Sequence, residues 1–473
     1  MVSVTDDVST PTTIRSNWAG NLEYRAARLL RPTTLEEVRE AVTAGGPVRA
    51  VGSRHCFNDI ADTTGTHLSL ESFEPVDAST LTVDTDAHGA TTVTVSGGAR
   101  YGDLATALYA HGYAVPNLAS LPHISVAGAI ATATHGSGVT NQGLGGAVVA
   151  LEIVTATGEV LTVRRGDGAA ETSGDAGSAA AAAAGSAGAA ELDADTDSAP
   201  LPFDAAVVHL GALGVVTRVT LAVEPTFDVR QDVFVDLPWE AFERDAGAVL
   251  GAAYSVSVFT TWRDDAMDQV WLKSRVDEIE TRPGGALALG EDFHGARRSP
   301  VPLHPLPGIS AESCTEQLGV AGPAHERLAH FKMDFTPSNG DELQSEYIVP
   351  REHAVAAVAA VRALREQIVP LLQVTEIRTM AADGFWLSPS GAQDSVGIHF
   401  TWLQRQPEVE ALLPVIEAAL APFDARPHWG KLFTTDAARL AELYPRLPEL
   451  RALAARLDPE GVLRNDYLDR VLG

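Results

Sequence analysis

The run of small residues NLASLPHISVAGAIATATHGSG, from Asn117 to Gly138, limits what this 473-residue chain can fold into more than any other stretch. Glycine, alanine and serine at this density let a backbone approach a ligand closely and direct successive N–H groups at an anion, as a pyrophosphate cradle requires. Tight packing of a helix against a strand explains the same composition equally well. A second stretch, GSRHCFN at 52–58, has the same small-residue character and follows the strand-like run VRAV. Two such loops in one domain favour a long dinucleotide held by backbone donors.

Length, charge and cysteine content exclude several classes of protein. At about 150 residues per domain, the chain is long enough for two or three domains and for an interior that encloses a large cofactor. Its formal net charge of -28 repels a phosphate backbone and an anionic membrane surface alike, so neither nucleic acid nor a membrane is an expected partner. We find no uncharged apolar stretch of about 18 residues and no signal-peptide pattern. Cys56 and Cys314 form neither a disulfide framework nor a zinc motif, which fits a reducing compartment. We expect a soluble, cytoplasmic monomer.

The first 225 residues alternate strand and helix signals. Thr34 can cap a helix with Glu37 in capping-box register. Residues 91–113 repeat the scheme as an alternating strand, a glycine pair and a short amphipathic helix. A hairpin is predicted to turn near Thr157-Gly158. This mixture is typical of an α+β domain rather than of strict βαβ winding.

Two further segments differ in composition from this first region. Residues 166–200 are low-complexity Ala, Gly, Ser and Asp, which bury too little apolar surface to offset the entropy of ordering, so we expect a disordered surface excursion. From about 226 to 425 new strands appear, together with a strong helix over 351–369 that ends before Pro370.

Several common chemistries lack their motifs in this sequence. We find no G-x-G-x-x-G after a strand, no G-x-x-x-x-G-K-[ST] and no G-x-S-x-G, which excludes the usual nicotinamide, P-loop and α/β-hydrolase sites. His325, Glu326 and His330 nearly match H-E-x-x-H. Five residues apart on a helix, however, the two imidazoles would point about 140° apart, too far to share one zinc ion. No metal site is predicted.

Motifs along nearly the whole chain resemble the FAD-dependent oxidases of the vanillyl-alcohol oxidase superfamily, and among them the alditol oxidases. The motifs that carry this resemblance are NWAGN at 17, LLRPTTLEEV at 29, GSRHCFN at 52, LPHISVAGAIATATHGSG at 121, LGALGVVT at 210, SCTEQLGVAGPAHERL at 313, LQSEYIVPREHA at 343, EIRT at 376, HFTW at 399 and RPHWGKLF at 426. The resemblance implies an FAD-binding domain of the vanillyl-alcohol-oxidase (PCMH) type at 1–225, with 166–200 as an insert. It also implies a substrate-binding cap domain with an antiparallel sheet and flanking helices at 226–425, and a C-terminal segment, 426–473, that returns to the FAD domain.

The same resemblance gives His55 a role. Family members carry FAD covalently, through a histidine in a G-S-G-H-S-F-N loop that is joined to the flavin 8α-methyl carbon, and His55 occupies that position. A neutral imidazole is the nucleophile such a bond requires. Arg54 and Cys56 depart from the family pattern of Gly and Ser, and we expect Cys56 to pack as a small hydrophobe rather than to attach flavin. The other residues expected to contact FAD are Ala50, Val51, Gly52, Ser53, Arg54, Cys56, Ser120, Ser125, Gly128, Ala129, Ile130, Ala131, Val216, Arg378 and His428.

Strand parity identifies candidate substrate residues. In VTEIRT, Glu376 and Arg378 share one strand face, and in VGIHFTWL His399 and Thr401 do the same. Parity alone favours a solvated sheet face with cross-strand ion pairs. The resemblance instead implies a polyol pocket formed by Ser120, Glu376, Arg378, Thr401 and Lys431. Lys431 is one of only three lysines in the chain.

The implied reaction oxidises the terminal primary alcohol of an alditol such as xylitol or sorbitol to the aldose, while O2 becomes H2O2. Hydride moves from the carbinol carbon to flavin N5, so the developing alkoxide needs nearby cations, a task that suits Arg378 and Lys431. His399 or Lys431 is expected to accept the hydroxyl proton. An L-gulono-1,4-lactone type oxidase or dehydrogenase of the same superfamily is the alternative. Arg54 and the insert also leave open an FAD-carrying module that does not turn over polyols.

Overall fold

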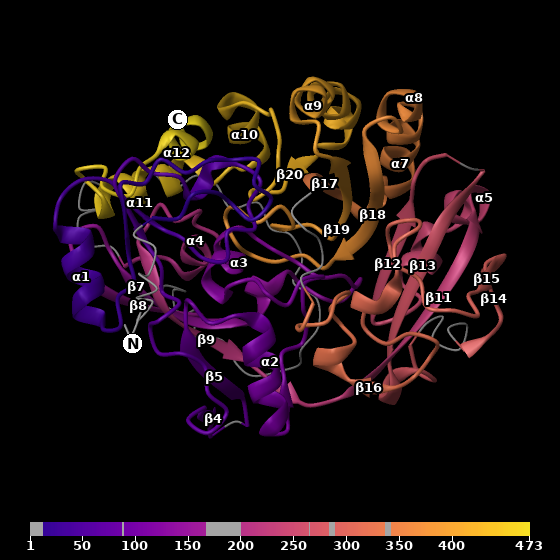
Figure 1. Ribbon diagram of the computed structural model, residues 1–473, viewed down its shortest axis with the longest axis horizontal. Helices are drawn as coiled ribbons and strands as arrows, with labels where there is room; N and C mark the ends of the chain where they lie inside the picture. Colours follow the sequence, from indigo (N-terminus) through magenta and orange to yellow (C-terminus); the bar gives the residue numbers. More distant parts are fainter. Residues whose placement is uncertain (1–12, 88, 167–199, 264, 283–288, 336–341) are drawn as a thin grey trace, which may run out of the picture.

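The computed structural model describes residues 13–87, 89–166, 200–263, 265–282, 289–335 and 342–473 (Figure 1). Apart from its two end residues, the low-complexity excursion predicted at 166–200 lies outside the described residues.

The N-terminal part begins with a small parallel sheet and one helix. The sheet has the order β1 (Arg28–Leu30), β3 (Thr66–Leu68), β2 (Val48–Ala50). Helix α1 (Leu35–Thr43) begins with the predicted capping box, because Thr34 accepts from the Glu37 N–H and the Glu37 side chain reaches back to the cap. Its apolar stripe packs on the sheet, where β2 ends and the loop 52–58 begins.

A five-stranded antiparallel sheet follows, in the order β4 (Val83–Thr85), β5 (Thr91–Ser96), β9 (Val215–Ala222), β7 (Val148–Val154), β8 (Val160–Arg164). Strands β7 and β8 form the predicted hairpin, and its turn places Gly158 at a φ of +78°, which glycine adopts without strain. Helices α2 (Tyr101–Ala110), α3 (Val126–Ala131) and α4 (Phe203–Val207) accompany this sheet, and a two-stranded pair joins β6 (Tyr113–Ala114) to β10 (Glu224–Pro225). The small-residue run 117–138 therefore consists of a loop, the short helix α3 and a second loop.

Within the described residues, the rest of the chain forms a ten-stranded sheet whose pairings are antiparallel. Its main path runs β14 (Asp292–Phe293), β15 (Ala296–Arg298), β11 (Asp228–Pro238), β13 (Ala266–Arg275), β12 (Ser255–Thr260), β18 (Leu372–Met380), β19 (Ser395–Leu403), β17 (Glu342–Pro350), β20 (Arg426–Pro427), and β16 (Gly322–Pro323) pairs with β11. The flanking helices are α5 (Trp239–Arg244), α6 (Ala246–Leu250), α7 (Ala354–Arg362), α8 (Arg365–Ile368) and α9 (Gln406–Leu420). The predicted α+β class, with an antiparallel sheet and flanking helices, is confirmed.

The single helix predicted over 351–369 is wrong in one respect, because the structure divides it. Helix α7 ends at Arg362, and α8 begins at Arg365. At the break, the Leu364 N–H donates to the Val361 carbonyl, which is one residue nearer than the helical partner. Buried residues of both helices, Val361 and Ile368 among them, pack in the core under the sheet.

The C-terminal segment returns to the N-terminal part. Helices α10 (Ala437–Leu443), α11 (Leu447–Leu457) and α12 (Asp466–Leu472), yellow in Figure 1, lie beside the indigo and purple segments. Tyr444, Tyr467 and Leu468 share one apolar core with α2, α3 and the five-stranded sheet. The C-terminal helices are thereby packed against the N-terminal part of the fold.

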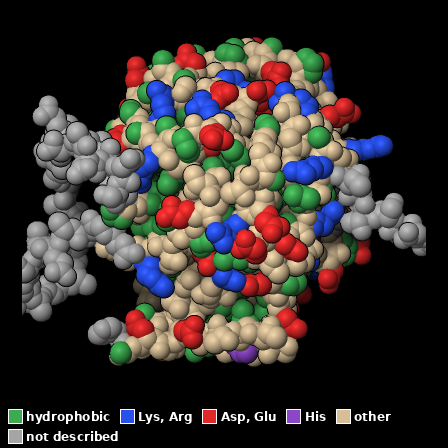
Figure 2. All heavy atoms as spheres, turned by 90° about the vertical axis from the view of Figure 1, so that its left-hand side faces the viewer, with side chains coloured by type: hydrophobic (Ala, Val, Ile, Leu, Met, Phe, Trp, Pro, Cys, Tyr) green, Lys and Arg blue, Asp and Glu red, His purple; other side chains and the backbone are tan. Residues whose placement is uncertain are grey.

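Ion pairs are common at the surface of the described residues. On the face shown in Figure 2, acidic and basic side chains are interspersed over the described residues. Many pairs are local, such as Arg39 with Glu36 at 2.8 Å. Among the described residues, no helix combines the length and the apolar character needed to cross a bilayer.

Candidate active site

The two small-residue loops predicted from the sequence lie against each other. A Cβ atom added to Gly52 would be 2.1 Å from Ser125 Oγ, so only glycine fits there without a shift. The Ser125 N–H donates to Ser53 Oγ at 3.2 Å and joins the loops directly. Gly97 approaches the backbone of β9 as closely, since a Cβ there would lie 2.2 Å from the Val216 carbonyl oxygen. The small residues therefore serve close backbone approach at the wall of a cavity.

One continuous cavity extends from these loops to the large sheet. Its wall includes every predicted FAD and substrate residue except Ile130. The side chain of Ile130 is 2% exposed and packs in the core formed with α2 and the five-stranded sheet, because it lies on the opposite side of the short helix α3. The predicted set is otherwise brought together from segments that are up to 381 residues apart, from Ala50 to Lys431.

His55 lies inside this cavity at the end of its loop. Its ring stacks on Trp18 with centroids 4.9 Å apart and an interplanar angle of 24°. Among the described residues, its Nδ1 atom is buried without a hydrogen-bond partner. Burial, reinforced by the nearby charges of His123 and Lys431, lowers the pKa of His55 to about 3. The imidazole is therefore neutral at physiological pH, the form that can attack an electrophilic carbon.

The backbone conformation of Arg54 explains why the resembling family usually has glycine before this histidine. Its φ is 64°, in the left-handed region that side chains other than glycine rarely adopt. The side chain is exposed and donates to the Ser16 carbonyl at 3.3 Å, while the Arg54 carbonyl accepts from the Trp18 N–H at 2.9 Å. Arg54 thus has a structural contact at the cavity rim.

We expect Arg54→Gly to stabilise the protein slightly. Left-handed backbone costs a residue with a Cβ about 1–2 kcal/mol, and glycine returns about 0.5–1 kcal/mol of that to the entropy of the unfolded chain. The net gain in free energy of unfolding is therefore up to about 1 kcal/mol, measurable by denaturant titration of the flavin-loaded protein. Arg54→Ala is the control, since it removes the same hydrogen bond but keeps the strain. A loss of stability in Arg54→Gly equal to that in Arg54→Ala would contradict this assignment.

Cys56 packs as expected. Both cysteines are free thiols. Burial raises the pKa of the Cys56 thiol to about 11, so a reactive thiolate is disfavoured. Its Sγ atom lies against Gly430, where a Cβ would approach it to 3.2 Å.

The polar faces of β18 and β19 point into the cavity, not into solvent. Glu376 pairs with His399 across the two strands, and Val374 pairs with Thr401. The side chains of Glu376 and Arg378 are only 5% and 6% exposed, so the solvated sheet face favoured by parity alone is wrong. Helices α7 and α9 cover the opposite, apolar face, which turns the polar one toward the FAD-side loops.

Arg378 is the centre of a buried charge network. Its Nη2 donates to Glu346 Oε1 at 3.0 Å, its Nη1 donates to Ser120 Oγ at 3.3 Å, and its Nε lies 3.6 Å from Glu376 Oε2. Burial alone would raise the pKa of Glu376, but the charge of Arg378 and the hydrogen bond from His330 outweigh it and hold the pKa far below its usual range. The same balance, with His135 and Arg378 as the opposing charges, keeps Glu346 ionised. The single guanidinium of Arg378 therefore lies beside two carboxylates and offsets one of their two charges.

Lys431 and His399 lie on the same side of the cavity. The ammonium of Lys431 donates to Gln344 Oε1 and lies 5.2 Å above the Phe57 ring. Burial, together with the charge of Arg378, lowers the pKa of Lys431, while Glu346 opposes that shift. Burial and the charge of Lys431 lower the pKa of His399 to about 3, and the Nδ1 atom of His399 has no hydrogen-bond partner among the described residues.

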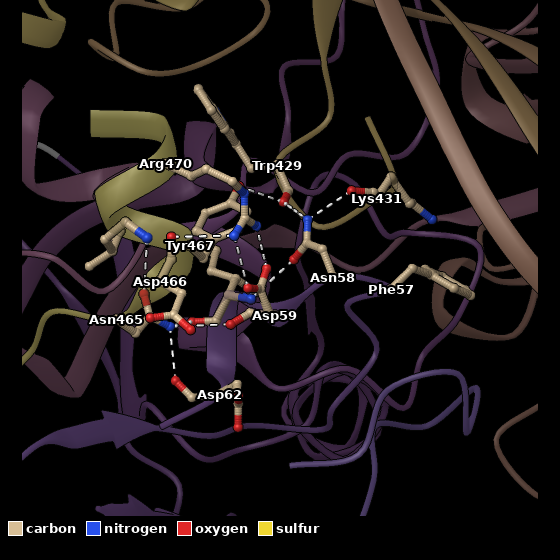
Figure 3. Close-up of polar contacts among 12 residues, drawn as sticks. Phe57, Asn58, Asp59, Asp62, Trp429, Lys431, Asn465, Asp466, Tyr467 and Arg470 are labelled. Atoms are coloured by element: carbon tan, nitrogen blue, oxygen red, sulfur yellow. Dashed lines mark hydrogen bonds and ion pairs between the residues drawn. The ribbon is translucent and has the colours of Figure 1, made fainter. Parts of the chain in front are cut away.

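Asn58 joins the His55 loop to the Lys431 loop (Figure 3). Its amide donates to the carbonyls of Trp429 at 2.8 Å and Lys431 at 2.7 Å, and the neighbouring Phe57 N–H donates to the Gly430 carbonyl at 2.8 Å. From α12, Asn465 holds the next turn through the carbonyls of Asp59, Ile60 and Asp62. The end of the chain therefore sets where Lys431 lies relative to His55.

Several cavity residues were missed by the sequence analysis. The residues that line the cavity are Trp18, His135, His330, Gln344 and Glu346. Lys273 lies behind the wall, in contact with His330. Alternation in LQSEYIV was a usable signal, because Gln344 and Glu346 share a strand face as Glu376 and Arg378 do. His330 drew attention only as a near match to a zinc motif, and no local pattern indicated its contact with Glu376.

One group of buried side chains has metal-ligand character. The ligand atoms of His135, Glu346 and His428 lie within 4.8 Å of one another. Arg378 already lies 3.0 Å from the same Glu346 oxygen, so a guanidinium occupies the position where a metal ion would balance that charge. Burial also keeps the pKa of His428 well below its ordinary value.

Comparisons with known proteins agree with this geometry. Residues 26–164 match a family model described as FAD binding domain, and residues 330–471 match the model of D-arabinono-1,4-lactone oxidase. The chain is 45% identical to an alditol oxidase of Streptomyces sp. over 97% of this chain and 98% of that protein. It is 30% identical to the L-gulono-1,4-lactone dehydrogenase of Mycobacterium tuberculosis over 97% and 99% of the two chains.

Solved structures give the same fold at low sequence identity. A solvent-stable cholesterol oxidase is similar with a TM-score of 0.65 at 15% identity and 96% of both chains covered. The cholesterol oxidase from B. sterolicum has a TM-score of 0.68 at 14% identity, with 97% of this chain and 96% of that chain covered. The fold and the cavity thus define an FAD-dependent oxidoreductase of the vanillyl-alcohol oxidase type. Within that superfamily the chain belongs to the alditol oxidase family.

The described residues fit this cofactor. The closely packed small-residue loops at Gly52 and Gly97 form one end of the cavity wall, where a ligand can approach the backbone closely. At the other end, the Nδ1 atoms of His55 and His399 are buried polar atoms without protein partners. Such atoms are costly unless a ligand or water satisfies them.

Proposed function

We propose that this protein is an FAD-dependent alditol oxidase that converts the terminal primary alcohol of a linear polyol, such as xylitol or sorbitol, to the aldose and reduces O2 to H2O2. The cofactor is attached covalently, as 8α-N-histidyl FAD, through His55. When bound, FAD accepts two electrons from the alcohol and passes them to oxygen.

The observation that supports this function most strongly is the polar sheet face inside the cavity. Glu376, Arg378, His399 and Thr401 lie on this face, and Ser120 and Lys431 join them from loops in the same cavity wall. An uncharged polyol offers many hydroxyls, each of which can donate and accept a hydrogen bond, so it satisfies both the carboxylate and the cations.

Arg378 stabilises charge on the reacting oxygen, and Lys431 does so once it has taken the proton. As the substrate hydroxyl loses its proton, negative charge develops next to the preorganised guanidinium of Arg378. Arg378 is held on three sides and can orient the alcohol without moving. The remaining hydroxyls bind to Glu376, Thr401 and Ser120.

Lys431 is the better proton acceptor of the two candidates. A pKa of about 3 makes His399 too weak a base to hold the proton at neutral pH. The pKa of Lys431 is lowered from a much higher starting value, toward the pH at which an amine can act as base. Nζ of Lys431 would take the proton, and Gln344 keeps that atom in place.

We expect Lys431→Met to slow flavin reduction by xylitol by about 100-fold or more, the usual contribution of a general base. The rate in the unchanged protein should rise with pH as Nζ deprotonates, and this limb of the profile should vanish in the variant. Anaerobic stopped-flow absorbance measures both. His399→Ala should slow the reaction less. Unchanged rates in both variants would show that neither side chain accepts the proton.

The lactone oxidases and dehydrogenases are the second candidate, since one family model and one relative of that kind match the chain. Peroxide release with xylitol and with L-gulono-1,4-lactone separates the two functions. We expect turnover with xylitol and little with the lactone. The reverse preference would favour the lactone reaction, and failure of both substrates to bleach the flavin under anaerobic conditions would exclude either activity.

The division of labour along the chain is part of the proposal. Residues 1–225 and 426–473 hold FAD, and residues 226–425 supply most of the substrate face. The protein works as a cytoplasmic monomer. Light scattering of the purified flavoprotein would test the oligomeric state.

A further inference from the structure

We propose that Lys273 and His330 are positioning residues that fix Glu376 as an ionised acceptor, with one oxygen held by His330 and the other left for a polyol hydroxyl. This inference rests on the proposed polyol oxidation. It also concerns a contact between protein groups that can be measured without substrate.

Lys273 is a lysine in an unusual place. It lies on β13, is 1% exposed, and its ammonium has three acceptors: the carbonyls of Leu328 at 2.6 Å and Ala329 at 2.9 Å, and Nδ1 of His330 at 3.0 Å. Three acceptors match the three N–H groups of an ammonium. Burial lowers the pKa of Lys273 to about 7, and the negative charge of Glu376 opposes that shift.

The contacts on both sides of the ring fix the tautomer of His330. A protonated Lys273 can only donate and an ionised Glu376 can only accept, so Nδ1 of His330 accepts and the ring proton is on Nε2. Nε2 then donates to Glu376 Oε1 at 2.8 Å, while Ser257 Oγ lies farther away at 3.4 Å. Burial lowers the pKa of His330 to about 4, so the ring carries one proton only. The Glu376 carboxylate therefore accepts a hydrogen bond from Nε2 of His330, whose position is fixed.

His330 also locates a second residue of the substrate face. Its backbone N–H donates to the Ser120 carbonyl at 3.0 Å, and the Phe331 N–H donates to the same oxygen at 3.3 Å. Trp271 encloses the imidazole, with ring centroids 5.2 Å apart. The segment that ends in His330 therefore couples Lys273, Ser120 and Glu376 in one rigid arrangement.

The chain uses arginine almost everywhere, with only three lysines among 34 basic residues, so a lysine at 273 is informative. A compact ammonium can donate to three acceptors around one point, whereas a planar guanidinium spreads five donors in a fork. The three acceptors that surround Nζ of Lys273 require the compact ammonium.

Loss of Lys273 leaves Nδ1 of His330 without its donor and lets the imidazole move away from the Glu376 carboxylate. Glu376 binds a hydroxyl that does not react, so its contribution should be equal in the ground state and the transition state and should appear in KM. We expect Lys273→Met to raise KM for xylitol by about 10- to 100-fold, the range for a hydrogen bond to a charged group, with a much smaller change in kcat. Lys332→Met is the matched control, because among the described residues the ammonium of Lys332 donates to the Glu312 carbonyl, outside the cavity.

Two variants of His330 separate positioning from mere packing. His330→Gln can still donate to Glu376 and should keep most of the affinity, whereas His330→Leu cannot and should resemble Lys273→Met. Visible absorbance of bound flavin and the melting temperature must stay close to those of the unchanged protein. Equal damage in the Gln and Leu variants, or an unchanged KM in Lys273→Met, would overturn the proposal.

A spectroscopic measurement decides the contact without turnover. In protein labelled with 15N-histidine, the His330 signal, assigned by its loss in His330→Gln, should show an unprotonated Nδ1 and a protonated Nε2. In Lys273→Met the Nδ1 signal should shift to that of a nitrogen that accepts no hydrogen bond. A protonated Nδ1 in the unchanged protein, or an Nδ1 signal unchanged in Lys273→Met, would overturn the inference. Failure of xylitol to reduce the unchanged protein would instead overturn the proposed function, and the Nδ1 signal would still report on Lys273.

Discussion

Replacing Arg378 by methionine is expected to lower kcat/KM for xylitol by about 100- to 1000-fold, the loss typical when one preorganised donor to a developing oxyanion is removed. Arg378 contacts Glu346 and Ser120 directly and lies beside Glu376, so its loss also leaves two buried carboxylates without their cation. Breaking such a buried pair costs about 3–5 kcal/mol of stability. Anaerobic flavin reduction and thermal melting measure the two effects separately.

Arg378→Lys and Arg405→Met are the controls for this effect. Lysine keeps the charge but cannot hold Glu346 and Ser120 at once, so activity should recover only in part. Arg405 is half exposed and pairs with Glu408 at 2.8 Å, a surface pair whose removal changes stability by about 1 kcal/mol or less. If Arg378→Met retained near-normal kcat/KM, the proposed stabilisation of the alkoxide by this side chain would be wrong.

Replacing His55 by alanine is expected to abolish covalent attachment of the flavin completely. The intact unchanged protein should carry an adduct of FAD mass on the peptide that contains His55, and the variant should not. Acid precipitation should leave the yellow colour in the pellet for the unchanged protein and in the supernatant for the variant. Because attachment withdraws electrons from the ring, flavin reduction by xylitol should also slow in reconstituted variant protein.

Cys56→Ser tests the alternative nucleophile in the same loop. The Cys56 thiol has a pKa raised to about 11 and packs against Gly430, so its replacement should leave the adduct unchanged. An adduct that disappears in Cys56→Ser and persists in His55→Ala would reverse the assignment.

Much of the local structure was predictable because it depends on neighbours in sequence. The capping box of Thr34 and Glu37 and the hairpin turn at Gly158 follow from the conformations that those residues favour. The division of the helix after Arg362 was not predictable, since the pattern over 351–369 continues across the break and packing under the sheet decides where it bends. The α+β class, which was predicted from the mixture of strand and helix signals, was confirmed by the structure.

The candidate site shows the same division between local pattern and tertiary packing. Strand parity placed Glu376 and Arg378 on one face, yet whether that face met solvent or a cavity depended on β17, on the loop carrying Lys431 and on the helices behind the sheet. Ile130 was assigned to the cofactor by its motif, but the rotation of the six-residue helix α3 turns it into the core.

By itself, the sequence determined which backbone segments can approach a ligand closely, because the absence of side chains at Gly52 and its neighbours is written in the residues themselves. It also determined, through motifs near His55 and Lys431, the family to which the chain belongs. Only the tertiary structure decided that Lys273, His330 and Glu346 join the site. Charges separated by dozens of residues acquire their partners, and hence their protonation, only when burial removes the water between them.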